Sequence, residues 1–271
     1  MHHVFIRQEQ LSEGGKVLRL TGDDFHHVTH VLRMKEGEEL SAALLADGTE
    51  DAAPSVEYRF GIEEIGGDHV LCRLRFVKEE NRELPTKITL LQCLPKGDKM
   101  ESIVQKAVEL GAHDILPVAA KRCVVKLDET KAQAKVRRWQ KIAEAAAMQS
   151  KRGVIPEVMQ VRTVADAIAS VTEYDLKLIP YELAAYEGTG SLRGEDAEQT
   201  AGMRETRMLM QRAGEAKRIA VFIGPEGGFE EKEVEQAKDA GFHAITLGRR
   251  ILRTETAGPA VLAWLMFLLE S

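Results

Sequence analysis

The stretch IAVFIGPEGG, residues 219–228, joins five apolar residues to a turn that contains three glycines and a proline. A short apolar run is typical of a buried strand, and glycine at its end lets the backbone approach a ligand because no Cβ stands in the way. A helical pattern follows at 231–240, with Gly241 as its C-terminal stop. Strand, glycine turn and helix is the order in which α/β proteins build small-molecule sites.

The same order recurs in LGRRILRTET, residues 247–256, after the apolar run Ala244–Leu247. This second turn carries Arg253 and Glu255 among apolar neighbours, where unpaired ionic groups are costly to bury. The two side chains could form a surface charge pair, but the apolar setting favours a binding site with reactive groups beside it.

Motifs for several other chemistries are missing. The glycine turn lacks the GxGxxG spacing of dinucleotide sites, and no Gly-Lys-Ser/Thr follows it as in a phosphate loop. His26 and His30 share a helix face, but no third ligand with suitable spacing is evident, so we predict no metal site. The three cysteines are widely spaced, which argues against a disulfide scaffold and suits a reducing cytosol.

From Lys87 onward, apolar runs alternate with helical patterns, which predicts a parallel α/β sheet. Asp98 and Glu101 form a plausible capping box for the helix that follows the first run, and Thr256 or Gly258 opens the final helix. Residues 187–203 are polar and contain glycine, which indicates a loop. The further apolar runs that we expect to be strands are 88–94, 115–118 and 176–179.

The first 76 residues have a different pattern of short alternating stretches separated by glycine turns, which predicts a small β-barrel. One short helix over Phe25–Arg33 interrupts it. A charged stretch, 78–83, followed by Pro85, indicates a linker. The four expected strands are 4–6, 16–20, 56–65 and 70–76.

Composition favours a cytoplasmic protein. The 271 residues are 44% hydrophobic and 30% charged, as is ordinary for a globular chain of one or two domains. No signal peptide is evident at Met1–Arg7, and the longest apolar run, Ala260–Leu269, is too short to cross a bilayer. We therefore expect no membrane association.

Charge is unevenly placed on a chain whose net charge is −6. Residues 121–152 contain ten Lys or Arg against three acidic residues, a local excess of seven positive charges. Such a cluster either binds phosphate groups or is a solvated helix surface, and charge alone does not separate the two.

Several short motifs follow one another along nearly the whole chain. In the identity and order of these motifs the chain closely resembles the RsmE family. That family comprises the 16S ribosomal RNA (uracil-N3)-methyltransferases of the SPOUT class. The motifs are VLR (31–33), KME (99–101), QK (105–106), ELG (109–111), RC (122–123), WQKIA (139–143), QSKR (149–152), the glycine turn (224–228) and LGRRILRTETA (247–257).

The resemblance implies an α/β fold in two domains. These are a PUA-like RNA-binding β-barrel over 1–77 and a SPOUT methyltransferase domain over 87–271, with 78–86 as the linker. The second domain would hold a deep trefoil knot, a rare exception to the usual rules of chain connection. The resemblance further implies S-adenosyl-L-methionine as cofactor, 16S ribosomal RNA of the small (30S) subunit as substrate, and a homodimer.

It also implies the site residues. Arg253 would stabilise the uridinate oxygen, while Glu255 would be either the base or a residue that orients Arg253, of which we favour orientation. The expected RNA contacts are Arg7, His27, Arg33, Lys121, Arg122, Lys151 and Arg152. The expected cofactor-binding residues are Leu178, Ile179, Pro180, Ile223, Gly224, Pro225, Glu226, Gly227, Gly228, Leu247, Gly248, Ile251, Leu252 and Arg253.

Two departures from the family pattern stand out: Glu230, where a Ser or Thr cap is usual, and a long loop over 187–215. Two competing functions remain open. A non-catalytic RNA-binding module would bind no cofactor and would tolerate loss of Arg253. A nucleotide-dependent oxidoreductase would need the dinucleotide fingerprint and an acidic ribose partner, which the sequence lacks.

Overall fold

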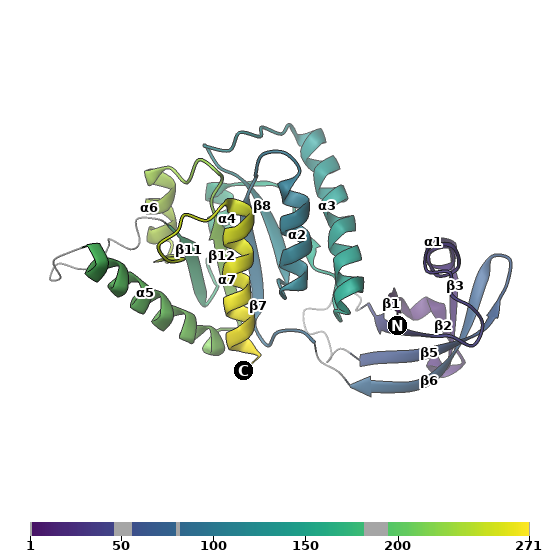
Figure 1. Cartoon of the computed structure of the whole chain (residues 1–271). Helices are drawn as coiled ribbons and strands as arrows, with labels where there is room; N and C mark the ends of the chain where they lie inside the picture. The colour runs from purple at the N-terminus through teal and green to yellow at the C-terminus, as the bar shows by residue number, and fades with distance from the viewer. Residues whose placement is uncertain (1, 46–55, 80–81, 182–194, 271) are drawn as a thin grey trace. The chain divides into compact units, whose positions relative to one another are not determined.

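The computed structural model describes residues 2–45, 56–79, 82–181 and 195–270 (Figure 1). The chain forms two compact units. Unit 1 consists of Met1–Glu83 and Ala147–Ile155, and unit 2 consists of Leu84–Ala146 and Pro156–Ser271.

A six-stranded sheet that curls into half a barrel makes up most of unit 1 (Figure 1). Its strand order is β1-β4-β5-β6-β3-β2, with β1 and β4 parallel and the other neighbours antiparallel. The predicted barrel is confirmed in this open form. The strands are β1 His2–Ile6, β2 Leu11–Ser12, β3 Val17–Thr21, β4 Glu39–Leu44, β5 Val56–Ile65 and β6 His69–Glu79.

The alternating sequence pattern explains which face of this sheet is the core. In β3, Leu18 and Leu20 are fully buried while Arg19 is exposed, because successive side chains of a strand point to opposite faces. Val70 from the adjacent strand β6 and Phe60 from β5 are fully buried in the same cluster. One face of the sheet therefore holds a continuous apolar core.

The helix predicted at Phe25–Arg33 lies earlier in the chain than expected. An α-helix, α1, covers Gly22–His26 and continues as a π-helical turn, η3, over His27–Val31. It begins where Gly22 adopts φ 58°, a backbone conformation that glycine enters without strain. The remaining short elements of unit 1 are the 3-10 turns η1 Gln8–Gln10 and η2 Glu13–Gly15.

Unit 2 is built on a seven-stranded sheet in which every pairing is parallel, as the alternation of strands and helices predicted. Its order is β10-β8-β7-β12-β11-β13, and β9 also pairs with β8. The strands are β7 Lys87–Cys93, β8 Asp114–Ala119, β9 Glu157–Val158, β10 Arg162–Thr163, β11 Leu176–Pro180, β12 Arg218–Ile223 and β13 His243–Ile245.

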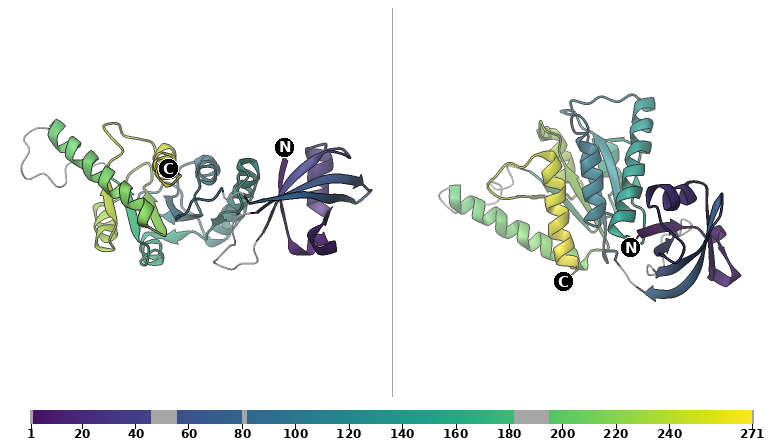
Figure 2. Two further views of the ribbon diagram at one scale, coloured as in Figure 1. Left: turned by 90° about the horizontal axis from the view of Figure 1, so that it is seen from below. Right: turned by 45° about the vertical axis from the view of Figure 1, so that its right-hand side comes forward.

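Helices cover both faces of this sheet, so its central strands are apolar on both sides. Figure 2 shows α2 and α7 against one face and α4 and α6 against the other, and each pair is in contact. The helices are α2 Lys99–Glu109, α3 Glu129–Ser150, α4 Val164–Ser170, α5 Glu195–Gln211, the 3-10 turn η5 Arg212–Glu215, α6 Glu231–Asp239 and α7 Thr254–Leu269.

Two local predictions in unit 2 are wrong. The loop expected over 187–203 gives way at Glu195 to α5, and its part from 187 to 194 lies outside the described residues. The capping box at Asp98 does not form, because the Glu101 carboxylate instead binds the Arg138 guanidinium at 2.8 Å. The second error comes from a partner that is distant in sequence, which local patterns do not reveal.

The starts of α6 and α7 also differ from expectation. Helix α7 begins at Thr254, earlier than either predicted start, with Arg253 as its N-cap. At α6 the weak cap Glu230 is compensated, because the Glu233 carboxylate accepts the backbone N–H of Glu230 at 2.8 Å.

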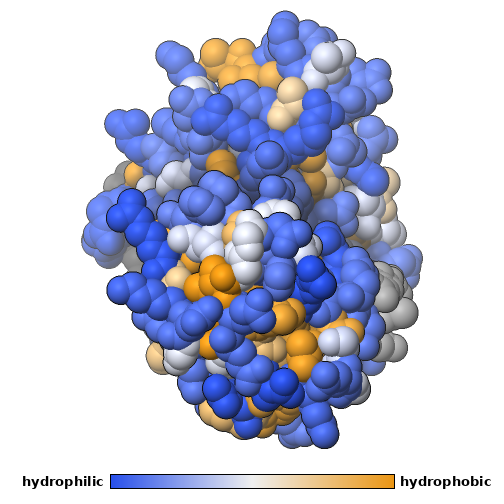
Figure 3. Space-filling model, turned by 90° about the vertical axis from the view of Figure 1, so that its right-hand side faces the viewer, coloured by the Kyte–Doolittle hydropathy of each residue, from blue (hydrophilic) through white to orange (hydrophobic). Residues whose placement is uncertain are grey.

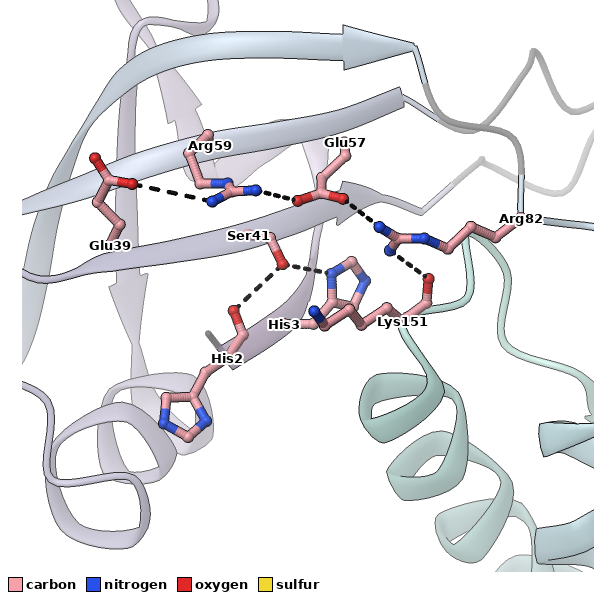
Figure 4. Close-up of polar contacts among 8 residues, drawn as sticks. All are labelled: His2, His3, Glu39, Ser41, Glu57, Arg59, Arg82 and Lys151. Atoms are coloured by element: carbon pink, nitrogen blue, oxygen red, sulfur yellow. Dashed lines mark hydrogen bonds and ion pairs between the residues drawn. The ribbon is translucent and has the colours of Figure 1, made fainter.

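The segment Ala147–Ile155 belongs to unit 1, although sequence patterns placed it in the second domain. In Figure 4 the Arg82 guanidinium bridges the Glu57 carboxylate, at 2.9 Å, and the Lys151 carbonyl oxygen, at 3.2 Å. These contacts fix the chain after β6 to a segment almost seventy residues away. The domain limits at 77 and 87 stay a prediction.

The surface in Figure 3 is mostly hydrophilic, with small apolar groups between the polar residues. The exposed large apolar side chains of unit 1 are Val31, Phe76 and Val77. In the part of the chain that the structure describes, no helix is both long and apolar enough to cross a membrane.

Candidate functional site

A cleft of about 1110 Å³ lies in unit 2, where the loops after β11, β12 and β13 meet. These three strands are neighbours in a parallel sheet, so their carboxyl ends lie at one edge. The segments Pro180–Tyr181, Ile223–Phe229 and Thr246–Thr254 line the cleft, together with Lys99, Arg122, Glu231 and Ala257.

The glycine turn has little room for side chains. A Cβ on Gly224 would lie 3.0 Å from ring carbons of Phe229, and one on Gly227 would lie 3.3 Å from Cβ of Arg122. Gly228 adopts φ 68°, which side-chain-bearing residues adopt with strain. The turn therefore presents bare backbone to the cleft, as the glycines in the sequence predicted.

A buried hydrogen-bond chain ties the first residue of α7 to this turn. The Thr254 hydroxyl donates to the Gly224 carbonyl oxygen at 2.7 Å and accepts from the Gln92 side-chain amide at 2.9 Å. The same Gln92 amide nitrogen donates to the Cys93 carbonyl oxygen at 3.0 Å. The end of β7, the glycine turn and the start of α7 are thus linked from within.

A second link lies on the more exposed side of the cleft. The Lys99 ammonium, at the start of α2, lies 3.0 Å from Oε1 of Glu226 and 3.2 Å from Oε2 of Glu255. Oε1 of Glu226 also accepts the backbone N–H of Lys96 at 3.0 Å. One cation therefore joins the glycine turn to the first turn of α7.

The electrostatics keep both carboxyl groups ionised at neutral pH. Burial acts to raise the pKa of Glu226 and Glu255, but backbone N–H groups and the Lys99 ammonium outweigh it and lower both pKa values. The Glu226 carboxylate, and less strongly Glu255, raises the pKa of Lys99 in return. Glu255 is therefore a weaker base than an ordinary glutamate.

Arg253 lines the cleft and is exposed, in agreement with its predicted place in the site. Its carbonyl oxygen accepts the backbone N–H groups of Thr256, at 2.8 Å, and Ala257, at 2.9 Å. Among the described residues Glu255 forms its ion pair with Lys99 and none with Arg253. The Arg253 cation also helps to lower the pKa of Glu255, and the orienting role of Glu255 stays a prediction.

Most of the predicted cofactor-binding residues lie together in the cleft. Leu178 and Ile179 do not line it, because both are fully buried inside β11 and support the loop from behind. Those that line it are Pro180, Ile223, Gly224, Pro225, Glu226, Gly227, Gly228, Leu247, Gly248, Ile251, Leu252 and Arg253.

Sequence reasoning gave no site role to several polar groups here, among them Lys99, Gln92, Tyr181 and Thr254. Lys99 belongs to the motif KME (99–101), but the sequence indicates no role for it. Its partners follow it by more than 120 residues, so no local spacing could have identified them. Gln92 carried one signal, as a polar residue at the end of an otherwise apolar strand.

The predicted RNA contacts divide between the units. Arg122 lies on the cleft, where its guanidinium donates to the Gly227 carbonyl oxygen at 3.3 Å. Lys121 is exposed and pairs with Glu230 at 3.1 Å. In unit 1, Arg7 and Arg33 are exposed, while His27 and Lys151 are partly buried.

The prediction that Arg152 contacts RNA is wrong. Its side chain is buried, with 4% of the residue exposed, and its guanidinium binds the Glu83 carboxylate. Glu83 also accepts the backbone N–H of Gly153 at 2.9 Å. Arg152 is therefore a structural ion-pair residue of unit 1, unavailable to a phosphate.

Comparison with known proteins points to one enzyme class. The family described as RNA methyltransferase domain matches residues 82–266, and the RNA methyltransferase PUA domain matches residues 20–45. The ribosomal RNA small subunit methyltransferase E of Bacillus subtilis (strain 168) is 35% identical over 258 residues, which cover 95% of this chain and 93% of that protein. The protein of the same name from Synechocystis sp. is 30% identical over 100% of this chain and 78% of its own length.

Solved structures agree with the sequence matches. The crystal structure of a ribosomal RNA small subunit methyltransferase E from Neisseria gonorrhoeae, bound to S-adenosyl methionine, superposes with a TM-score of 0.76. It is 29% identical, and the match covers 99% of this chain and 98% of that one.

Proposed function

Because the chain belongs to the ribosomal RNA small subunit methyltransferase E family of RNA methyltransferases, we propose that it methylates N3 of one uridine in 16S ribosomal RNA, with S-adenosylmethionine as donor. The family that the sequence motifs predicted is thereby confirmed. The observation that carries the proposal is the cleft itself, in which three loops from adjacent parallel strands meet Arg253.

The residues of the cleft fit such a cofactor. Its volume of about 1110 Å³ slightly exceeds the usual range of small-molecule pockets, which leaves room for a nucleoside cofactor and a target base. Bare backbone at Gly224, Gly227 and Gly228 offers peptide groups where side chains would block a ligand. When bound, the cofactor supplies an electrophilic methyl group on a sulfonium.

The role left to the protein is to hold uridine N3 in line with that methyl group and to favour loss of its proton. Arg253 is the exposed N-cap residue of α7, and we assign its cation to the oxygen that gains charge as N3 is deprotonated. Glu255 is unsuited as the base, because its lowered pKa and its ion pair with Lys99 stabilise the carboxylate. Positioning supplies the rest of the rate enhancement, for which about 7–11 kcal/mol is attainable.

RNA binding completes the proposal. A uridine in a base pair hides its N3 atom, so the target must be unpaired or flipped out to enter the cleft. The exposed residues Arg7, Arg33, Lys121 and Arg122 are candidates for phosphate contacts. The partly buried His27 and Lys151 are further candidates. Cytoplasmic localisation, where ribosomes are assembled, follows from this substrate.

We further propose the homodimer and the trefoil knot around Leu247–Thr256 that the resemblance implies. The dimer has one supporting feature here: Trp264, Phe267 and Leu268 near the end of α7 are all at least 37% exposed. Light scattering of the purified protein should give twice the 30.1 kDa of one chain, and a monomer would contradict the dimer.

The function is tested on small ribosomal subunits from cells that lack this chain. The subunits are incubated with the protein and labelled S-adenosylmethionine, the RNA is digested, and nucleosides are identified by mass. We expect N3-methyluridine, formed at one position. Label in another nucleoside would contradict the predicted atom, and absence of cofactor binding by calorimetry would favour the non-catalytic RNA-binding module.

A further inference from the structure

Lys99 binds two carboxylates that come from different parts of the chain. Glu226 belongs to the glycine turn after β12, and Glu255 belongs to the first turn of α7. The ammonium of Lys99 lies 3.0 Å from the first and 3.2 Å from the second, and it also lines the cleft. A single cation therefore holds together two of the loops that form the site.

The charges explain why a cation is needed at this place. The side chains of Glu226 and Glu255 are 30% and 23% exposed, so water screens their repulsion only in part. With Lys99 present, the three groups carry a net charge of −1. Without it, the carboxylates of Glu226, which lines the cleft, and Glu255, in the first turn of α7, would have no shared counter-ion.

The two residues that follow Arg253 are each held by a contact to another part of the chain. The next residue, Thr254, is bound from within to the Gly224 carbonyl oxygen at 2.7 Å. The residue after that, Glu255, is bound from outside to Lys99. The backbone that carries Arg253 is thus held on two sides, and Lys99 supplies one of them.

We propose that Lys99 is a positioning residue for methyl transfer: by joining Glu226 to Glu255 it fixes the glycine turn relative to the first turn of α7, and so fixes Arg253. The inference rests on the proposed function, since Arg253 is the residue assigned to the uridine oxygen. Lys99 acts through its carboxylate partners and contacts neither reacting atom.

The test compares Lys99→Met with Lys99→Arg, and uses Lys232→Met as a matched control that removes an exposed lysine at the start of α6. We expect Lys99→Met to lower kcat about 10- to 100-fold, the cost of a misplaced catalytic group, with cofactor Kd changed less than about threefold. Lys99→Arg keeps the cation and should recover most of kcat. Lys232→Met should match the wild type.

A charge-compensated double variant separates positioning from general damage. Glu226→Gln removes one carboxylate but keeps an acceptor for the Lys96 N–H. If the ammonium matters because it offsets two carboxylates, Lys99→Met with Glu226→Gln should be more active than Lys99→Met alone. If the losses of kcat from the two substitutions add fully in the double variant, the proposal is overturned.

The pH profile gives a further readout. Backbone hydrogen bonds also lower the pKa of both carboxyl groups, but loss of the ammonium removes one lowering interaction from each, so they take up protons at higher pH in Lys99→Met. Protonation relieves their repulsion in the variant, so the ratio of wild-type to variant kcat should shrink as the pH falls towards about 5. A constant ratio would contradict the proposal.

Two outcomes distinguish this inference from the function itself. A cofactor Kd raised more than about tenfold with kcat unchanged would make Lys99 a ligand contact and overturn the positioning role. If the wild type fails to methylate RNA, the proposed function fails, and hydrogen exchange still tests the link. In that case Lys99→Met should speed amide exchange at 254–258, Lys99→Arg should restore protection, and unchanged exchange would overturn the proposal.

Discussion

Arg253 occupies the N-cap of α7, and the two residues after it hold the backbone in place. The side chain itself is exposed on the cleft, so its guanidinium is available to a ligand. Glu255 looked like a reactive acid in the sequence. In the structure it is the ion-pair partner of Lys99, and Arg253 stays the residue that we propose for the catalytic role.

Replacing Arg253 by alanine should nearly abolish methylation while cofactor binding survives. The guanidinium is assigned to charge that develops only during the reaction, so its loss should lower kcat by about 100- to 1000-fold. Methyl incorporation into small-subunit RNA measures kcat, and calorimetry measures cofactor Kd. Arg250→Ala, which removes the same charge from the same loop, should cost less than about tenfold, and an active Arg253→Ala enzyme would refute the assignment.

His3 is a buried titratable group in unit 1. Its Nδ1 atom lies 2.9 Å from the Ser41 hydroxyl, and both residues are shown in Figure 4. Burial lowers its pKa, with Arg82 and Lys151 acting in the same direction and Glu57 opposing them. His3 is therefore neutral in the folded protein at pH values where it would already be protonated in the unfolded chain.

Acid should consequently destabilise the protein through His3. Because its folded pKa lies below the unfolded value of 6.5, the unfolded state binds more protons, and stability falls as the pH drops below that value. The slope contributed by this one group reaches at most about 1.4 kcal/mol per pH unit. Urea unfolding at several pH values should show a smaller slope for His3→Gln than for the wild type, while the exposed neighbour variant His2→Gln should keep the wild-type slope.

At the scale of elements, the glycine turn depends on backbone conformation as much as on space. Gly228 has no atom within 4 Å of an added Cβ, so only its φ of 68° opposes a side chain. Gly227 is the reverse case, because its φ is ordinary and Arg122 fills the space. Two neighbouring glycines are thus required for two different reasons.

The substitution Gly228→Ala should destabilise the protein by about 1–2 kcal/mol and weaken cofactor binding, because alanine is strained at this φ. Denaturant unfolding and calorimetry measure the two effects. Gly214→Ala is the control, since Gly214 in η5 has the same open surroundings and no positive φ. Equal stability of the two variants would show that the turn relaxes without cost.

The whole molecule is acidic but carries its positive excess in one segment, 121–152. Part of that charge is used internally: Arg138 binds Glu101 and Arg152 binds Glu83. Lys121 and Arg122 are exposed and lie next to the cleft loops, through Glu230 and Gly227. They are the part of the segment best placed to meet RNA phosphates near the site.

Salt should therefore weaken RNA binding, and these two residues should account for part of the dependence. In the double variant Lys121→Gln with Arg122→Gln, the negative slope of log K against log salt should become less steep by about 1.5, because two phosphate contacts are lost. Filter binding of small-subunit RNA fragments at several salt concentrations measures it. Lys232→Gln, with the same exposed charge on α6, serves as the control, and an unchanged slope in the double variant would exclude these residues as phosphate contacts.

The sequence by itself determined the parallel sheet of unit 2, most of its strands and helices, the β-rich character of unit 1 and the family, but it missed β4 and α5. Periodicity and glycine turns are local signals, and each is complete within some ten residues, as in 219–228. The loops of the cleft were predictable for the same reason. So was Arg253, which stands among apolar neighbours in one of those loops.

Only the tertiary structure decided which side chains work together. Lys99 meets Glu226 and Glu255, Gln92 meets Thr254, and Arg152 meets Glu83, each across many tens of residues. Chain folding sets these distances, and no spacing in the sequence encodes them. The predicted RNA contact of Arg152 therefore fails, because its guanidinium is buried and already bound to Glu83, while Glu255 has a partner, Lys99, that the sequence did not reveal.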